Sequence, residues 1–215
     1  MKYHHVLFDL DGTLTDPYWG ITNSIKYALN KFNIAEQNDH KLKSFIGPPL
    51  EQSFMEYYHF NKNEAKKAIE FYREYYSVKG IYENKLYHGI DIVLKTLNSK
   101  NINCIVATSK LEKYAVKVLQ HFNIDLYFSG VAGSNLEGTL VEKEDIIEYI
   151  IKKYKLEKEK TIMVGDRKYD IIGAKNNGIN SIGVLYGYGT QKELEEIKPT
   201  YLCNNIDELL KLLLE

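Results

Sequence analysis

The pattern of hydrophobic and polar positions changes character twice along this chain. The stretch that begins His4-His5-Val6-Leu7-Phe8 is apolar and strand-prone at its start, and it then ends abruptly in Asp9-Leu10-Asp11-Gly12, with two carboxylates one residue apart. From Tyr18 to about Glu83 no stretch has the pattern of a strand, and helical spacing recurs instead. Glycine and proline residues interrupt this region, which indicates several short helices. We expect helices at 18–32, 39–45, 50–59 and 62–79, with Asp16 and Pro17 as N-cap and first position of the first one.

From Tyr87 onward, apolar runs of strand length alternate with amphipathic helical segments. Strands are expected at 103–107, 128–132, 161–164 and 181–184. Such alternation predicts a parallel sheet with helices on both faces. The expected fold class is therefore α/β, with a Rossmann-like parallel sheet core and an inserted all-α helical region. We place the core at 1–15 and 86–215 and the helical insert at 16–85.

Composition excludes some classes of protein. A length of 215 residues suits one large domain, or a core with a smaller insert. A net charge of -1 gives no reason to expect a nucleic acid polymer or a membrane as partner. Only Cys104 and Cys203 are cysteines, and neither a signal peptide nor a membrane-spanning run is recognisable. We expect a reduced, cytoplasmic protein that is a monomer or a weak dimer.

The two carboxylates after the first strand carry the strongest chemical signal. Asp9 and Asp11 are one residue apart at a strand end, so their side chains lean the same way. Two like charges held together are costly unless a cation lies between them, and Mg²⁺ prefers oxygen ligands. An EF-hand does not fit, because the sixth and twelfth positions from Asp9 are Leu14 and Gly20. Taken alone, the pair is more often a solvated strand end.

Further polar residues follow other predicted strands, where ligands bind in parallel sheets. The clusters at three strand ends are Asp9 with Asp11, Thr108 with Ser109, and Asp166 with Asp170. Lys143 begins a helix in the same half of the chain. No glycine-rich dinucleotide motif follows the first strand. Carboxylates with Mg²⁺, together with a hydroxyl and a lysine for an anion, describe phosphoryl transfer. An aspartate can serve there as nucleophile and a second one as general acid and base.

These residues resemble the four motifs of the haloacid dehalogenase superfamily, and the match covers essentially the whole chain. The motifs are Asp9-Leu10-Asp11-Gly12-Thr13, Thr108, Lys143, and Gly165-Asp166-Arg167-Lys168-Tyr169-Asp170. The helical insert resembles the α-helical cap of that superfamily. Two further segments resemble its phosphoglycolate phosphatase-like branch: Leu14-Thr15-Asp16 with Gly20-Ile21, and Ile46-Gly47-Pro48-Pro49-Leu50.

The resemblance implies roles for the acidic residues. Asp9 would be the nucleophile and a metal ligand. Asp11 would be the general acid and base, with its backbone carbonyl on the metal. Asp166 would be the other metal ligand, and Asp170 would support the metal or the lysine from outside the ligand set.

The resemblance also implies a phosphate site. Thr108 and the backbone of Ser109 would hold the phosphoryl group, and Lys143 would neutralise it. Related phosphatases often have proline after this lysine, whereas Lys143 lies between two glutamates. Lys110 is therefore the substitute candidate for the same role.

The function implied is Mg²⁺-dependent hydrolysis of a small phosphomonoester, of the phosphoglycolate or nucleotide type, through an aspartyl-phosphate intermediate. The presence of Asp11 argues against dehalogenation, and Gly165 before Asp166 favours hydrolysis over mutase chemistry. A phosphomutase and a non-catalytic binding protein on the same fold are the alternatives. The aromatic residues of the insert form either its core or a platform for a nucleotide base. Phosphoglycolate, a nucleoside monophosphate, pyrophosphate and a sugar phosphate all stay open as substrates.

Overall fold

The chain divides into two compact units in a computed structural model that describes residues 2–135, 140 and 142–215. The first unit, called the core unit here, comprises Met1–Asp16 and Leu86–Glu215. The second, called the insert unit, comprises Pro17–Lys85.

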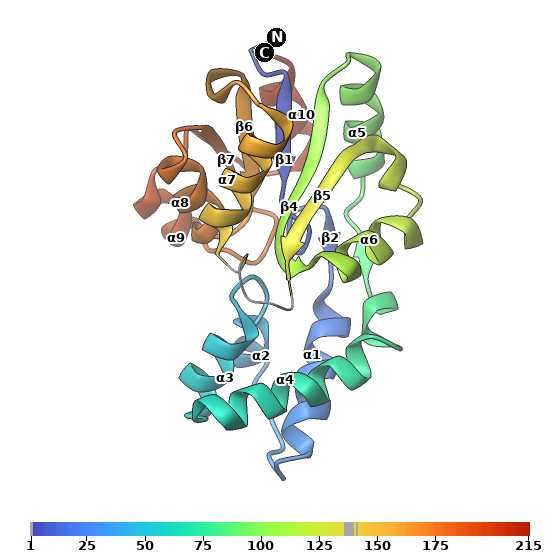
Figure 1. The fold of residues 1–215 in the computed structure, drawn as a ribbon, viewed down its shortest axis with the longest axis vertical. Coiled ribbons are helices and arrows are strands. Elements are labelled where there is room, and N and C mark those ends of the chain that lie inside the picture. The colour runs from blue at the N-terminus through green and yellow to red at the C-terminus, as the bar shows by residue number, and fades with distance from the viewer. Residues whose placement is uncertain (1, 136–139, 141) are drawn as a thin grey trace. The chain divides into compact units, whose positions relative to one another are not determined.

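A six-stranded sheet forms the centre of the core unit, in the order β5-β4-β1-β6-β7-β8 (Figure 1). Every pairing between neighbouring strands is parallel, as expected from the alternation of strands and helices. The strands are β1 (His5–Phe8), β4 (Asn103–Leu111), β5 (Phe128–Ser134), β6 (Thr161–Gly165), β7 (Asn180–Val184) and β8 (Tyr201–Cys203).

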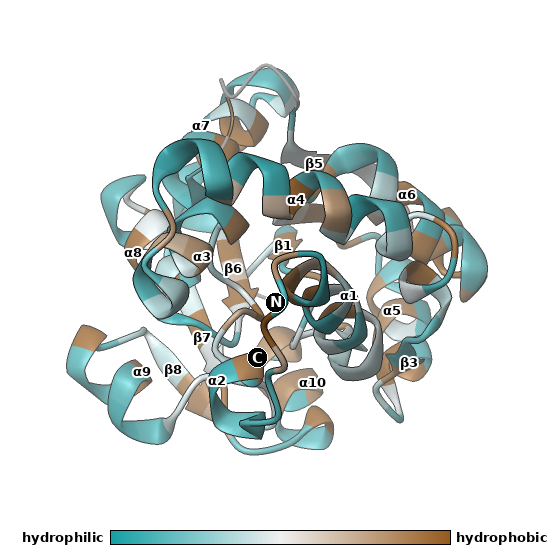
Figure 2. Cartoon of the chain, turned by 90° about the horizontal axis from the view of Figure 1, so that it is seen from below, coloured by the Kyte–Doolittle hydropathy of each residue, from teal (hydrophilic) through white to brown (hydrophobic). Residues whose placement is uncertain are grey.

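Helices cover both faces of this sheet, and the predicted α/β class is confirmed. α7 and α8 lie on one face, and α5 and α10 lie on the other (Figures 1 and 2). Figure 2 shows hydrophobic residues on β1 and β6 and hydrophilic ones on the outer sides of the helices. The helices are α5 (Ile90–Ser99), α6 (Glu112–His121), α7 (Lys143–Tyr154), α8 (Lys168–Asn176), α9 (Gln191–Ile197) and α10 (Ile206–Leu214), with 3₁₀ turns η2 (Asp125–Tyr127) and η3 (Lys158–Lys160).

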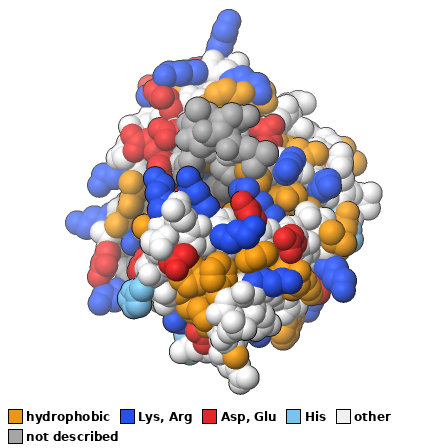
Figure 3. All heavy atoms as spheres, turned by 60° about the horizontal axis from the view of Figure 1, so that its bottom comes forward, with side chains coloured by type: hydrophobic (Ala, Val, Ile, Leu, Met, Phe, Trp, Pro, Cys, Tyr) orange, Lys and Arg blue, Asp and Glu red, His pale blue; other side chains and the backbone are white. Residues whose placement is uncertain are grey.

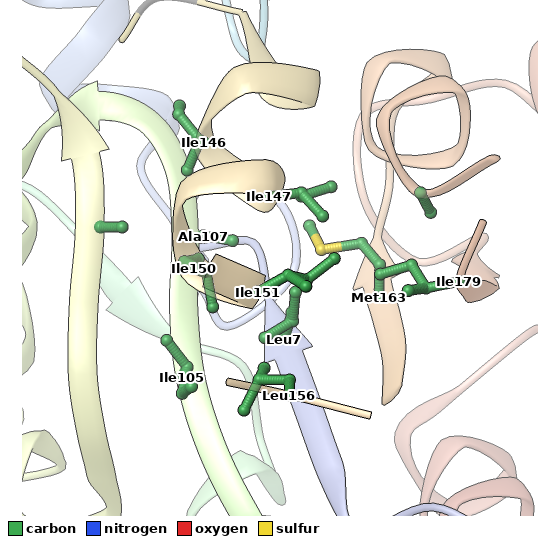
Figure 4. Close-up of a cluster of buried hydrophobic side chains, with 12 residues drawn as sticks. Leu7, Ile105, Ala107, Ile146, Ile147, Ile150, Ile151, Leu156, Met163 and Ile179 are labelled. Carbon is green, nitrogen blue, oxygen red and sulfur yellow. The ribbon is translucent and has the colours of Figure 1, made fainter. Parts of the chain in front are cut away.

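The packing of α7 against the sheet explains why isoleucine residues recur at helical spacing along α7. Leu7 on β1 and Ile105 on β4 point to the same face, since both occupy matched positions in the parallel register. Isoleucine side chains of α7 cover them and are almost completely buried (Figure 4). These isoleucines are Ile146, Ile147, Ile150 and Ile151. Burial of this stripe fixes where α7 begins relative to the ends of the strands.

The register of the central strands brings the polar strand ends together. Phe8, the last residue of β1, pairs with Val106 on one side and Val164 on the other. The backbone N–H of Asp9 then donates to the carbonyl of Val164 at 2.9 Å. Thr108 lies two residues after Val106, and Asp166 lies two residues after Val164. Both therefore lie at the same edge of the sheet as Asp9.

The insert unit is helical, with no strand among its described residues apart from the first residue of β3. Its aromatic side chains largely pack on one another: Phe54 is fully buried and lies 5.1 Å, centroid to centroid, from Phe45. Trp19, in contrast, is 54% exposed. The elements are α1 (Tyr18–Asn30), α2 (Asp39–Lys43), α3 (Leu50–Tyr58), α4 (Lys62–Tyr76) and η1 (Gly80–Tyr82). Where the chain leaves and re-enters the core unit, β2 (Thr15–Asp16) pairs with β3 (Lys85–Leu86).

Three local expectations were wrong. Asp16 does not cap α1: it lies in β2, its carboxylate accepts a hydrogen bond from the Tyr188 hydroxyl, and the N-cap is Pro17. β4 continues through Thr108 to Leu111, past the predicted end at 107, with an irregular register after Thr108. α9 and β8 were not predicted, because α9 is mostly polar and β8 has only three residues.

The surface agrees with a nearly neutral chain. On the face shown in Figure 3, lysine and arginine side chains are interspersed with aspartate and glutamate side chains. Within the described part of the chain, no helix is both long and apolar enough to cross a bilayer. Cys104 and Cys203 are both buried free thiols.

Candidate active site

Asp9 and Lys143 form a buried ion pair at the edge of the sheet. The ammonium Nζ of Lys143 donates to Oδ1 of Asp9 at 2.7 Å and to the carbonyl of Ala107 at 2.8 Å. It also lies 2.8 Å from Oδ1 of Asp170. Burial alone would lower the pKa of Lys143, but the charges of Asp170 and Asp9 outweigh it and raise the pKa. Lys143 is therefore a fixed cation.

Asp11 forms an ion pair with a different lysine, Lys110. Oδ2 of Asp11 pairs with Nζ of Lys110, and both side chains are buried. Burial raises the pKa of Asp11, and the charge of Lys110 works against this effect. The two lysines that we considered for one role thus contact different carboxylates: Lys143 contacts Asp9, and Lys110 contacts Asp11.

Asp166 and Asp170 complete the acidic cluster, and both are almost completely buried. Burial, with repulsion from Asp9 and Asp170, raises the pKa of Asp166 to about 8. Burial also raises the pKa of Asp170 to about 6, although Lys143 opposes the shift. Such raised pKa values indicate that too little positive charge lies near these two carboxyl groups to stabilise their ionised forms.

The donor set fits a hard divalent cation. Carboxylate oxygens of Asp9, Asp166 and Asp170 all lie within 4.8 Å of one another, close enough to share one ion. Asp11 does not belong to this group through its carboxylate, which leaves its backbone carbonyl as the ligand that the sequence resemblance implies. Among the described residues, no donor bonds to Oδ1 of Asp11, although the atom is buried.

A backbone N–H and a side-chain hydroxyl hold Asp166, and neither contact was predicted from the sequence. The N–H of Tyr188 donates to Oδ2 of Asp166 at 2.7 Å, and the hydroxyl of Thr13 lies 3.3 Å from Oδ1. Gly12 has a φ of +92°, and a Cβ at Gly12 or at Gly187 would collide with Asp166. The available signal was the run Tyr186-Gly187-Tyr188-Gly189 just after a predicted strand, where ligand loops of parallel sheets occur.

The phosphate-binding candidates lie beside this cluster. Thr108 is fully enclosed on β4, the strand next to β1, and its hydroxyl accepts from the N–H of Lys110 at 3.3 Å. Ser109 follows it on the same strand. The structure thus places all seven candidate residues in the core unit and joins Asp9, Lys143 and Asp170 by direct contacts.

The chain is similar in sequence to a known family and to named proteins. The family described as haloacid dehalogenase-like hydrolase matches residues 6–184. A protein of Pseudomonas aeruginosa named 5′-nucleotidase is 41% identical over 213 residues, which cover 99% of this chain and 96% of that protein. A Mycobacterium tuberculosis protein named tyrosine-protein kinase PtkA is 34% identical over 207 residues, covering 95% of this chain and 70% of that protein.

The chain is also similar to a solved structure. The crystal structure of a predicted phosphatase from Clostridium acetobutylicum superposes with a TM-score of 0.96 at 46% identity, covering 100% of this chain and 99% of the other. The resemblance inferred from the four motifs is thereby confirmed, and the alternative of a non-catalytic binding protein is set aside. The chain is an enzyme that belongs to the haloacid dehalogenase-like hydrolase family.

Proposed function

We propose that the protein is a Mg²⁺-dependent phosphatase that hydrolyses a small phosphomonoester through an aspartyl-phosphate on Asp9. The observation that carries this proposal is the imbalance of buried charge around Asp9. Four buried carboxylates, those of Asp9, Asp11, Asp166 and Asp170, lie together with the buried Lys143 and with Lys110, whose side chain is 7% exposed. When ionised, this set lacks two positive charges, which matches one divalent cation.

Asp9, Asp166 and the backbone carbonyl of Asp11 would hold the Mg²⁺ ion, with Asp170 beside them. When bound, Mg²⁺ supplies charge that lets an anionic nucleophile meet an anionic phosphoryl group. Lys143 would orient the carboxylate of Asp9 through the 2.7 Å contact. Asp9 is then ready to attack phosphorus as the nucleophile.

The remaining residues complete the proposed cycle. Thr108 and the backbone of Ser109 would hold the phosphoryl oxygens, since the strand end beside Asp9 presents them there. Asp11 would protonate the leaving oxygen and later take a proton from the attacking water. The insert unit would act as the cap that selects the leaving group.

A nucleoside 5′-monophosphate is the substrate class that we propose first. The relative that is 41% identical over nearly the whole chain carries the name 5′-nucleotidase, which supports this choice. Phosphoglycolate, pyrophosphate and a sugar phosphate are the competing substrates.

The test measures phosphate release from these four compounds, with Mg²⁺ or with EDTA. Asp9→Asn removes the nucleophile and should reduce release by about 10³-fold or more. Asp125→Asn is the matched control, because Asp125 is an exposed carboxylate on the same unit. We expect Mg²⁺-dependent release that Asp9→Asn abolishes and Asp125→Asn preserves, with the nucleotide turned over fastest.

Other results would point elsewhere. Isomerisation of the sugar phosphate without phosphate release would indicate the phosphomutase. Transfer of the γ-phosphate of ATP to tyrosine, with no release from the four compounds, would indicate the activity in the name of the M. tuberculosis relative. Release that survives in Asp9→Asn would contradict the aspartyl-phosphate mechanism.

A further inference from the structure

The two carboxylate oxygens of Asp11 are in different surroundings. Oδ2 pairs with the ammonium of Lys110, and the side chains of Asp11 and Lys110 are only 11% and 7% exposed. Oδ1 is buried as well, but no donor from the described residues bonds to it. One oxygen of this carboxylate is therefore occupied by a fixed cation, and the other has its lone pairs available.

Lys143 cannot take the place of Lys110 in this arrangement. Its ammonium donates hydrogen bonds to Asp9 and to the carbonyl of Ala107, and it forms an ion pair with Asp170 at 2.8 Å. These three contacts hold the ammonium of Lys143 beside Asp9. The structure thus gives each aspartate of the first motif its own lysine.

We propose that Lys110 is a positioning residue that holds Oδ2 of Asp11 so that Oδ1 carries the proton to and from the reacting oxygens. This inference rests on the proposed function and assigns an atom to its proton transfer. Proton transfer requires a fixed donor-to-acceptor geometry, and an aspartate side chain that can rotate would present either oxygen. The ion pair with Lys110 prevents that rotation.

The proton and electron pairs balance over the two steps. In the first, an oxygen of Asp9 forms a bond to phosphorus, the ester P–O bond breaks, and the proton on Oδ1 moves to the leaving alkoxide. In the second, water adds to phosphorus, the bond to Asp9 breaks, and Oδ1 takes a proton from the water. Lys110 contacts Oδ2 of Asp11 in both steps and touches no reacting atom.

The test compares two substrates that differ in their need for an acid. Adenosine 5′-monophosphate releases an alkoxide that must be protonated, whereas p-nitrophenyl phosphate releases a phenolate that is stable without a proton. Lys110→Met keeps the length of the side chain and removes its charge. We expect kcat/KM for adenosine 5′-monophosphate to fall about 100-fold, and that for p-nitrophenyl phosphate to fall less than about 5-fold. Lys117→Met, at an exposed position on α6, should change neither.

Two further variants separate positioning from a structural effect. Lys110→Arg retains the charge and should recover most of the activity towards adenosine 5′-monophosphate. In an Asp11→Asn background, adding Lys110→Met should cause no further loss, because Lys110 acts through Asp11. Equal losses for the two substrates, or additive losses in the double variant, would overturn the inference while leaving the phosphatase proposal intact. Absence of phosphate release from both compounds by the unaltered protein would overturn both.

Discussion

The ammonium of Lys143 lies 2.7 Å from Oδ1 of Asp9, although the two residues are 134 positions apart in the chain. The pair is formed because the apolar stripe of α7 packs on β1 and β4, which brings the first residue of α7 to the end of β1. The packing that stabilises the core unit therefore also holds Lys143 beside Asp9, the candidate nucleophile. Perturbing the pair should affect both folding and catalysis.

Lys143→Met should remove most of the activity and destabilise the protein. The change leaves Asp9 and Asp170 buried without their shared cation. Loss of one partner from a buried ion pair typically costs about 3–5 kcal/mol. We expect a lower free energy of unfolding in denaturant titrations and a kcat reduced by about 100-fold or more. Lys152→Met, on the exposed side of the same helix, is the control; equal effects of the two changes would contradict the role of Lys143.

Gly12→Ala should weaken Mg²⁺ binding more than it weakens the fold. Gly12 has a φ of +92°, and a Cβ there would displace the carboxylate of Asp166. Gly178 also has a positive φ, +69°, but a Cβ there meets nothing within 4 Å. Alanine at either position should therefore lose about 1–2 kcal/mol of stability.

Only Gly12→Ala should also raise the Mg²⁺ concentration needed for half-maximal activity, by about 10-fold or more. Thermal unfolding measures the loss of stability, and a titration of activity against Mg²⁺ concentration measures the Mg²⁺ requirement. The interpretation fails if Gly178→Ala shifts the Mg²⁺ requirement as strongly.

The order of strands and helices was predictable because burial on both faces leaves long apolar runs in the sequence. The runs that form β1, β4 and β6 are of this kind, and so is the isoleucine stripe of α7. β8 was missed because three residues are too few for a period, and Asp16 was misassigned because its partner, Tyr188, lies 172 positions away. Long-range partners of this kind leave no local pattern.

Residue types at strand ends predicted the members of the candidate site but not their pairing. Local sequence could not decide whether Lys110 or Lys143 would lie near Asp9, since that depends on the packing of α7. Nor could it show that the N–H of Tyr188 binds Asp166. A backbone donor can belong to any residue type, so the sequence carries no sign of its use.

Ile150→Ala should destabilise the core unit by about 2–5 kcal/mol, the usual range for a fully buried isoleucine. Ile150 lies in the cluster between α7 and the sheet (Figure 4). Ile172→Ala provides the control, because that side chain on α8 is 36% exposed and should change stability by less than about 0.5 kcal/mol. Chemical denaturation measures both. Similar losses for the two variants would argue against α7 as the element that secures this face of the sheet.

The stability of the metal-free protein should fall as the pH rises from about 5 to 8. Burial and like charges raise the pKa of Asp166 from 3.8 to about 8 and that of Asp170 to about 6. Between the unfolded and folded pKa values, the folded protein binds more protons than the unfolded chain. The free energy of unfolding therefore decreases with pH, by at most about 1.4 kcal/mol per pH unit for each group.

Mg²⁺ should reverse this trend, because its ligands are the ionised carboxylates and it binds the folded protein better at high pH. The measurement is the thermal unfolding midpoint at pH 5 and pH 8, with EDTA and with Mg²⁺. We expect the increase caused by Mg²⁺ to be larger at pH 8 than at pH 5. Asp166→Asn should flatten the pH dependence in EDTA, whereas Asp125→Asn should preserve it. If the unaltered protein became more stable at pH 8 without metal, and Asp166→Asn behaved identically, the acidic cluster would not be the source of the linkage.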